Sequence, residues 1–189
     1  MKKWYSLWTM LLMAVLSMSF VSCDWWEDED IAYTLEGTWR GNMYVSSEWD
    51  GRTYDATYSE ISFLRDPYRY SSGTGYWVDY YSNTGWGRDY VANHIEWNVN
   101  CQTIKVYFVE EGTTIWIENY SLNDNYFSGT IYDGDCRVKF SLRHTSSPNW
   151  NDYYYGWDDY YYYSKSVDMT RASDSAAEVK APKRFFRTK

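Results

Sequence analysis

The chain has 189 residues, 22% of them Phe, Trp or Tyr, and its formal net charge is −8. Residues 24–163 contain 9 Lys and Arg against 23 Asp and Glu. An acidic body argues against nucleic acid as a partner, because phosphate binding needs a positively charged face. The length that follows residue 22 fits one domain with its own core.

Residues 1–22 predict a signal peptide. Two lysines follow Met1, residues 7–21 carry no charge, and Ser22 precedes Cys23. The uncharged stretch is shorter than the about 20 apolar residues that a transmembrane helix needs. Val21-Ser22-Cys23 resembles the lipobox of bacterial lipoproteins. The resemblance implies that the Cys23 thiol carries lipid such as palmitate, becomes the first residue, and anchors the chain to a membrane.

Residues 23–34 predict a lipidated acidic tether. Five of the seven residues from Asp24 to Asp30 are acidic. The cluster resembles the surface-export signals of some Gram-negative outer-membrane lipoproteins, which implies a domain that faces the medium. A solvated acidic linker is the alternative. No metal site is expected here, because contiguous acids lack the alternating spacing of a calcium loop.

Short strand patterns then follow one another. Apolar and polar side chains alternate, most cleanly at Val138, Phe140 and Leu142, and turn residues such as Asp50-Gly51 separate the patterns. Short turns require successive strands to pair as antiparallel neighbours. Eight strands are predicted, at residues 38–46, 52–64, 68–81, 92–99, 102–110, 114–122, 126–133 and 136–144.

A meander of this kind leaves two exposed edges unless it closes. The sequence therefore predicts an all-β fold over residues 35–163, an eight-stranded antiparallel up-and-down meander closed into a small barrel. Large inward side chains are expected to fill its interior, namely Trp97, Phe108, Phe127 and Phe140.

Gly37 and Trp39, at the start of the first predicted strand, resemble the Gly-x-Trp opening of lipocalin-like domains. Small bacterial lipoproteins with such domains often begin this way soon after the lipid cysteine. The resemblance implies a lipocalin-like barrel in which Gly37 and Trp39 have a structural role, with the Trp packed over one end.

The excess of aromatic residues has two interpretations. Trp and Tyr rings can fill both faces of a small sheet, or they can stack on sugars and other planar ligands. For the second case the predicted ligand is a small apolar molecule or a glycan. The rings predicted to be exposed for it are Tyr44, Trp77, Trp86 and Trp116.

No catalytic residue, cofactor or metal site is predicted. The Cys-x-x-Cys, His-Glu-x-x-His, Gly-x-Ser-x-Gly and phosphate-loop signatures are absent from the sequence. His94 and His144 are predicted to be surface residues. Glu60 and Glu96 are expected on a solvated strand face rather than as the carboxylate pair of a glycosidase.

The predicted meander places Cys101 and Cys136 in turns at opposite ends of the sheet. Bridged cysteines need Cα atoms within about 7 Å. We therefore predict that these two cysteines are not bonded to each other.

Beyond the last strand, residues 151–163 predict a tyrosine-rich flap or extra edge strand, packed on the barrel or across one mouth. A disordered segment is the alternative. An envelope protein partner is a candidate for contact with this segment. Residues 164–189 are small, polar and basic, and they predict a disordered tail.

Together these features predict a surface-exposed outer-membrane lipoprotein with a non-enzymatic, lipocalin-like binding or structural domain. A glycan-binding or adhesin-like module of the cell envelope is the first alternative. A carboxylate-dependent glycan hydrolase is the second.

Overall fold

A computed structural model describes residues 25–157 and 181–187. The predicted signal peptide, Cys23 and residues 158–180 lie outside this part of the chain. The described elements are α2 (Trp25–Leu35), β1 (Gly37–Asn42), β2 (Val45–Trp49), β3 (Arg52–Arg65), β4 (Ser72–Tyr81), β5 (Tyr90–Asn100), β6 (Thr103–Phe108), β7 (Thr113–Leu122), β8 (Tyr126–Asp133), β9 (Cys136–Thr145), the short helix η1 (Trp150–Asp152) and β10 (Lys183–Phe186).

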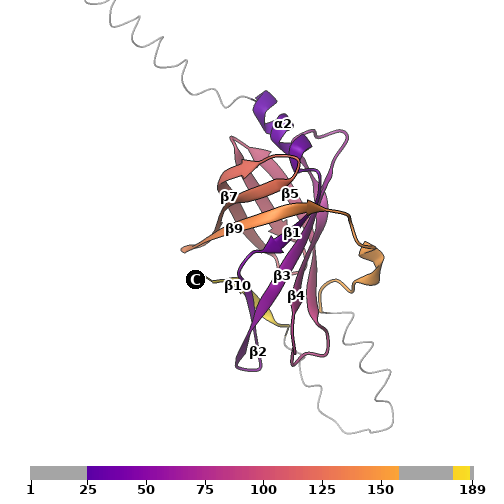
Figure 1. Ribbon diagram of the computed structural model, residues 1–189, viewed down its shortest axis with the longest axis vertical. Coiled ribbons are helices and arrows are strands. Elements are labelled where there is room, and N and C mark those ends of the chain that lie inside the picture. Colours follow the sequence, from indigo (N-terminus) through magenta and orange to yellow (C-terminus); the bar gives the residue numbers. More distant parts are fainter. Residues whose placement is uncertain (1–24, 158–180, 188–189) are drawn as a thin grey trace, which may run out of the picture.

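Eight of the strands close into an antiparallel barrel, as predicted. Strands β3 to β9 form a continuous meander, and β1 pairs with β9 on one side and with β3 on the other (Figure 1). The alternation seen in the sequence produces this ring. In β9, for example, Val138, Phe140 and Leu142 are buried, whereas Arg137 and the other intervening side chains face solvent.

The first predicted strand is divided into β1 and β2. The chain bends between them at Tyr44, whose φ of 54° is left-handed and whose amide donates to the side chain of Asn42. This bend lets the long strand β3 pair with β1 along one part and with β2 along another. Strand β2 therefore projects past the ring, at the end of the barrel where β10 lies (Figure 1).

Large side chains occupy the interior of the ring. Trp97, Phe108, Phe127 and Phe140 are each at most 4% exposed, so their predicted inward orientation is confirmed. Phe127 packs edge-on against Phe140 with ring centroids 4.9 Å apart. The core of the domain is therefore the barrel interior, built largely from aromatic and branched residues.

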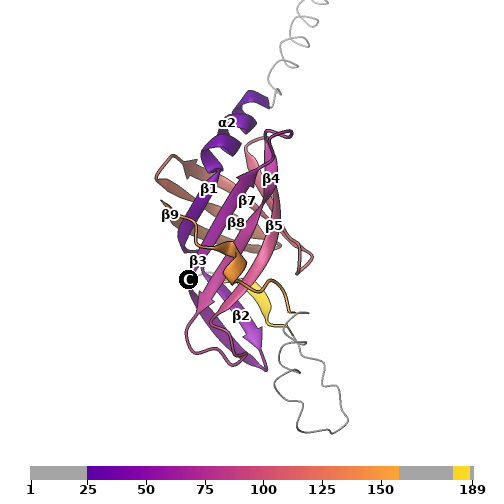
Figure 2. The same cartoon turned by 90° about the vertical axis from the view of Figure 1, so that its right-hand side faces the viewer.

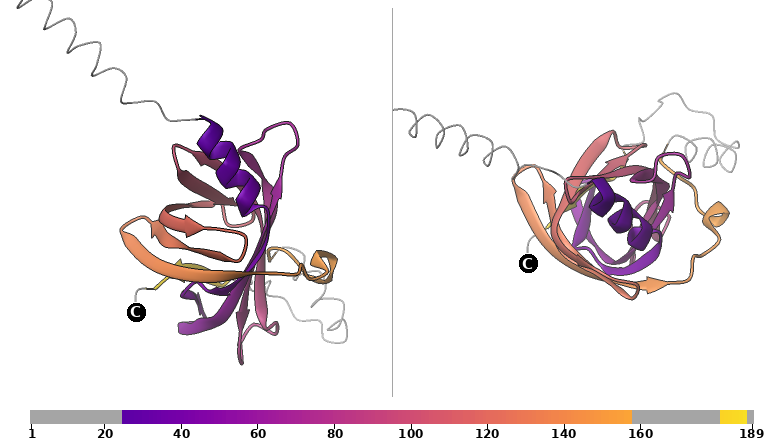
Figure 3. Two further views of the ribbon diagram at one scale, coloured as in Figure 1. Left: turned by 45° about the horizontal axis from the view of Figure 1, so that its top comes forward. Right: turned by 90° about the horizontal axis from the view of Figure 1, so that it is seen from above.

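The stretch that we expected to be an acidic tether is instead the helix α2, which covers one end of the barrel (Figure 3). Ala32 and Leu35 on this helix are fully buried. The Asp28 carboxylate accepts hydrogen bonds from the backbone amides of Cys101 and Gln102, at 2.9 and 3.0 Å. An acid of the predicted tether is thus used to hold the β5–β6 turn.

The basic tail was predicted to be disordered, and this is wrong for Lys183–Phe186. These residues form β10, which pairs antiparallel with β2. Strand β2 has a free edge with unpaired backbone groups, and pairing with β10 gives these groups hydrogen-bond partners.

The two cysteines of the barrel are not bonded to each other, as predicted. Cys136 is a free thiol. None of the helices within residues 25–157 and 181–187 is long and apolar enough to cross a membrane.

We expect Asp28→Ala to lower the free energy of unfolding by about 1–3 kcal/mol, because it leaves two backbone N–H groups in a tight turn without acceptors. Urea unfolding followed by tryptophan fluorescence measures the loss. Asp30→Ala removes a charge from an exposed position on the same helix and serves as the control. Equal unfolding midpoints for the two variants would show that α2 is not held through Asp28.

Candidate functional site: the plugged mouth of the barrel

A buried carboxylate lies inside the apolar barrel, toward the end opposite α2. Asp79 is 0% exposed and points inward from β4. One of its oxygens, Oδ1, accepts hydrogen bonds from Ser59 Oγ at 2.5 Å and from Trp77 Nε1 at 2.9 Å. A buried charge needs both hydrogen bonds and a counter-charge to be tolerated.

The counter-charge comes from Arg184, on the C-terminal strand β10. Its side chain is 2% exposed, and Nη1 lies 3.3 Å from Asp79 Oδ2. The same guanidinium contacts Glu111 with Nε 3.1 Å from Oε1, and Nη2 donates to Oε2 at 3.1 Å. Its central carbon lies 3.5 Å from the centroid of the Phe108 ring, a cation–π contact.

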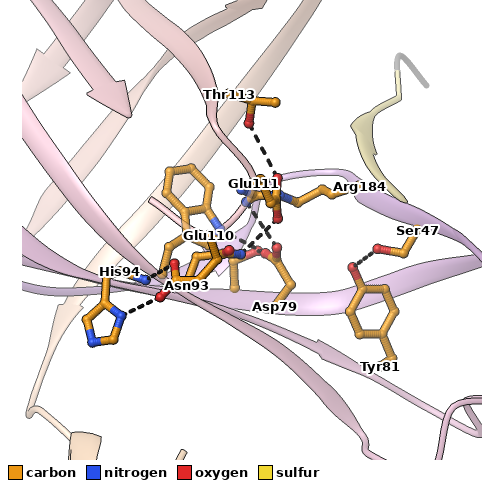
Figure 4. Close-up of polar contacts among 11 residues, drawn as sticks. Ser47, Asp79, Tyr81, Asn93, His94, Glu110, Glu111, Thr113 and Arg184 are labelled. Atoms are coloured by element: carbon orange, nitrogen blue, oxygen red, sulfur yellow. Dashed lines mark hydrogen bonds and ion pairs between the residues drawn. The ribbon is translucent and has the colours of Figure 1, made fainter. Parts of the chain in front are cut away.

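We call this end of the barrel, with Asp79, Glu111 and Arg184 at its centre, the mouth. Its residues come from several elements (Figure 4). Trp77, Asp79 and Tyr81 alternate with outward residues along β4, so all three point inward. Glu111 comes from the turn after β6 and accepts a hydrogen bond from Asn93 Nδ2 at 2.9 Å. The Tyr81 hydroxyl is hydrogen-bonded to that of Ser47 on β2, at 2.8 Å.

The electrostatics follow from burial and from the pairing. Burial raises the pKa of the Asp79 carboxyl, while Arg184 and the donors on Ser59 and Trp77 lower it. Burial disfavours the charged form of Arg184, but Glu111 and Asp79 outweigh that effect and raise its pKa. Burial also raises the pKa of the Tyr81 hydroxyl, and the nearby Asp79 charge adds to this. The mouth therefore holds a permanent cation between two acids.

The four rings predicted to bind ligand do not come together. Trp77 is fully buried beneath Arg184, and Trp86 is 4% exposed, so the prediction that these two are exposed is wrong. Tyr44 is half-buried and lines a groove beside β10. Trp116 is 40% exposed on the outer wall. Of the four, Trp116 is thus the ring most open to a ligand from outside.

Trp86 belongs to a second aromatic cluster, between the β2–β3 hairpin and the β4–β5 loop. Its ring packs edge-on against Tyr54, Tyr81 and Trp49, with centroids 4.9, 5.1 and 6.4 Å away. Edge-to-face packing of this kind stabilises apolar clusters. Trp86 therefore has a packing role in the loop that flanks the mouth.

Gly37 and Trp39 lie under α2, at the other end. Trp39 is fully buried, donates from Nε1 to the Leu35 carbonyl at 2.8 Å, and packs edge-on against Phe127. A Cβ at Gly37, whose φ is +132°, would lie 2.5 Å from His144 Nε2. This position favours glycine because a φ of +132° strains any residue with a side chain.

The remaining candidates for chemistry occupy ordinary places, with one exception. His94, His144 and Glu96 are exposed, as predicted. Glu60 is only 6% exposed, so its predicted place on a solvated face is wrong. The Tyr80 hydroxyl donates to it at 2.8 Å.

The segment around η1 explains this burial, because it covers the outer face of β4 and β5 (Figure 2). Tyr153 is hydrogen-bonded to the Tyr80 hydroxyl at 2.5 Å, and Trp150 stacks on Tyr76 at 5.0 Å. The predicted tyrosine-rich flap thus packs on the barrel as far as Trp157. Residues 158–163 of that prediction lie outside the described residues.

The sequence signal for the mouth was weak. Carboxylates are abundant in this sequence, and neither Asp79, before Tyr80 and Tyr81, nor Glu111, in the turn before Gly112, stands in a motif. Arg184 lay in a tail with no strand pattern. No group of three or more His, Cys, Asp or Glu side chains able to hold a metal ion occurs in the part of the chain that is described.

No protein-family model matches the chain, and no curated protein matches it. Among solved structures, the chain is similar to a redesigned β-barrel with 14% sequence identity and a TM-score of 0.37. That similarity covers 61% of this chain and 95% of the redesigned one. The geometry of the site is therefore the basis for the functional argument.

We expect Arg184→Met to lower the free energy of unfolding at pH 7 by about 3–5 kcal/mol, because Asp79 loses its buried partner. The loss is smaller below about pH 4, where Asp79 is protonated in both the folded and the unfolded chain. As pH rises, the unfolded carboxyl ionises first, while the folded one, its pKa raised further, holds its proton. The stability of the variant therefore falls relative to wild type as pH rises.

Urea unfolding between pH 3.5 and 8 measures this dependence. The double variant Asp79→Asn/Arg184→Met removes the titrating group and is expected to flatten the difference. Arg187→Met, which breaks an exposed pair with Asp55, is the matched control. A pH-independent loss in Arg184→Met would contradict the role of Asp79.

Proposed function

We propose that the chain is an outer-membrane lipoprotein, anchored through Cys23 and facing the cell surface, that displays a non-enzymatic, lipocalin-like barrel for binding. The observation that carries the proposal is the position of α2. This helix begins two residues after Cys23 and is docked on one end of the barrel. A lipid on Cys23 would therefore hold that end close to the membrane.

The same arrangement orients the rest of the domain. Strands β2 and β10 lie at the opposite end (Figure 1). With the helix end toward the lipid, the mouth that holds Arg184 faces away from the membrane. A ligand or partner arriving from outside would meet this end first.

The contacts of the acids support a non-enzymatic role. The fold brings Asp79 and Glu111 together around a common point, as a glycosidase requires of its two carboxylates. Arg184 occupies that point and pairs with both of them. A sugar would have to displace a buried guanidinium to reach either acid, which favours binding over hydrolysis.

We expect Cys23→Ser to remove the lipid and move the protein from the membrane fraction to the soluble fraction. Intact mass and detergent partitioning measure the change, and surface proteolysis of whole cells tests which side the domain faces. Cys136→Ser keeps the lipid and is the matched control. A Cys23 thiol bonded to Cys101 cannot also carry the lipid, so a disulfide between these two in the native protein would refute the anchor.

A second candidate function, the binding of an acidic glycan, rests on the outer wall of β6 to β9. Lys105, Trp116, Tyr132 and Arg137 are successive cross-strand neighbours in one row. The Arg137 guanidinium lies 5.3 Å from the Tyr132 ring. Lys105 also lines a surface groove with Glu96 and Tyr107. The exposed Trp116 and the half-buried Tyr132 between two cations suit a sugar that carries negative charge.

We expect Trp116→Ala to weaken binding of acidic oligosaccharides by about tenfold, the effect of losing about 1.4 kcal/mol. Glycan-array binding followed by calorimetry on any hits measures this. Tyr68→Ala removes a ring that is 89% exposed at the β3–β4 turn and is the control. Equal affinities for the two variants would remove this candidate function.

A further inference from the structure

Strand β10 lies on the barrel as a bound peptide does on a receptor. It adds to the free edge of β2 with four register pairs, from Lys183 opposite Glu48 to Phe186 opposite Val45. The amide of Arg187 continues the ladder by donating to the Tyr44 carbonyl at 2.9 Å. Main-chain pairing of this kind gives affinity, and pockets for alternate side chains give specificity.

Two such pockets are present, for residues that point to the same side of β10. Arg184 enters the first pocket, between Asp79 and Glu111 and over Phe108. Phe186 is 6% exposed in the second pocket, with its ring edge-on to Trp77 at 6.2 Å. The two pockets together therefore suit a segment with an arginine followed two residues later by an aromatic residue.

The backbone of β10 is also held at its far end. The Cys136 thiol, at the start of β9, donates to the Phe186 carbonyl at 3.1 Å. Lys183, in contrast, is exposed. The side chains of β10 that enter the barrel are thus those of Arg184 and Phe186, whereas that of Lys183 does not take part.

The ring of the barrel does not depend on β10. Strands β1 and β3 to β9 close on each other, and β10 pairs with β2 outside that ring. Displacement of β10 would leave the ring intact and would expose the edge of β2 together with the Asp79 carboxylate. An empty site would therefore select a replacement with the same pattern.

The connection between the barrel and β10 is long enough for the C-terminal segment of one molecule to reach the barrel of another. Residues 158–180 join Trp157 to Ala181, and 23 residues can span at most about 83 Å at about 3.6 Å per residue. A connection of this length can reach the mouth of a second barrel that lies beside the first. Exchange of an identical element between copies is a low-cost route to a dimer.

We propose that the mouth of the barrel is a strand-acceptor site for an Arg-x-Phe segment, and that the C-terminal segment of a second copy fills it in place of the chain's own. In that exchange Arg184 of one copy pairs with Asp79 and Glu111 of the other. The buried site is complete in either arrangement, so the two differ in connectivity and not in contacts. The proposal does not depend on the lipid anchor.

Two full-chain variants, purified separately in detergent, test the exchange. The acceptor variant Arg184→Ala/Phe186→Ala has an intact mouth and a tail that cannot fill it. The donor variant Asp79→Asn has an intact tail and a weakened mouth. When they are mixed, we expect at least about ten times more dimer than either forms alone, measured by native mass spectrometry and by energy transfer between labels.

Matched controls identify the contacts responsible. Adding Arg184→Ala to the donor is expected to abolish the dimer, whereas adding Lys183→Gln, at an exposed position, is expected to leave it unchanged. An acceptor that carries Phe186→Ala alone keeps the ion pair and replaces the double variant if that one does not fold, as judged by circular dichroism. No dimer from folded partners, or a dimer that persists without Arg184, would overturn the proposal.

Discussion

The buried charge of Asp79 constrains the whole mouth of the barrel. A carboxylate at this depth costs several kcal/mol unless it is paired and hydrogen-bonded. Trp77 on the same strand and Ser59 on the neighbouring strand β3 provide two donors, but the remaining oxygen needs a cation from outside the ring. The chain provides that cation from its C-terminal segment, more than 100 residues away in sequence. The ion pair between Arg184 and Asp79, together with the ladder between β10 and β2, thus fixes where the last part of the described chain lies.

An acid holds the covering element at each end of the barrel, but the two ends differ in which element carries that acid. Under α2, the acid belongs to the cap, and Asp28 reaches down to backbone amides of a strand turn. At the mouth, the acid is Asp79 of the barrel, and Arg184 of β10 provides the positive charge. The helix end is held by several buried apolar side chains in addition, such as Ala32 and Leu35. The mouth relies on one arginine, one phenylalanine and a short ladder, so it is the end better suited to exchange.

Sequence patterns predicted the ring of strands but neither of the two elements that cover its ends, α2 and β10. Alternation over six or more residues, as in β5 and β9, fixes both strand and inward face, and short turns fix the order of pairing. Helix α2 was hidden because its apolar contacts, Ala32 and Leu35, lie just after a run of acids that suggested a linker. Strand β10 has four residues, too few for a period to be visible. Both caps depend on tertiary contacts, which local patterns do not encode.

The ligand-binding prediction failed at Trp77 for a related reason. Glycines at 73 and 75 interrupt the alternation at the start of β4, so the inward parity of Trp77 and Asp79 could not be read from that strand alone. Both glycines are required by close approach of the backbone, since a Cβ at either would lie within 2 Å of a carbonyl oxygen on β3. Gly73 and Gly75, which allow β3 and β4 to approach closely, therefore also hid the inward orientation of Trp77 and Asp79 in the sequence pattern.

The free thiol of Cys136 gives the mouth a chemical asymmetry. It lies at the seam between β9 and β10, with its sulfur against the Phe186 backbone. A bulky group attached to that sulfur would occupy the space in which β10 sits. Covalent modification at this one atom would therefore act as a wedge, keeping the strand out while leaving the eight-stranded ring of the barrel untouched.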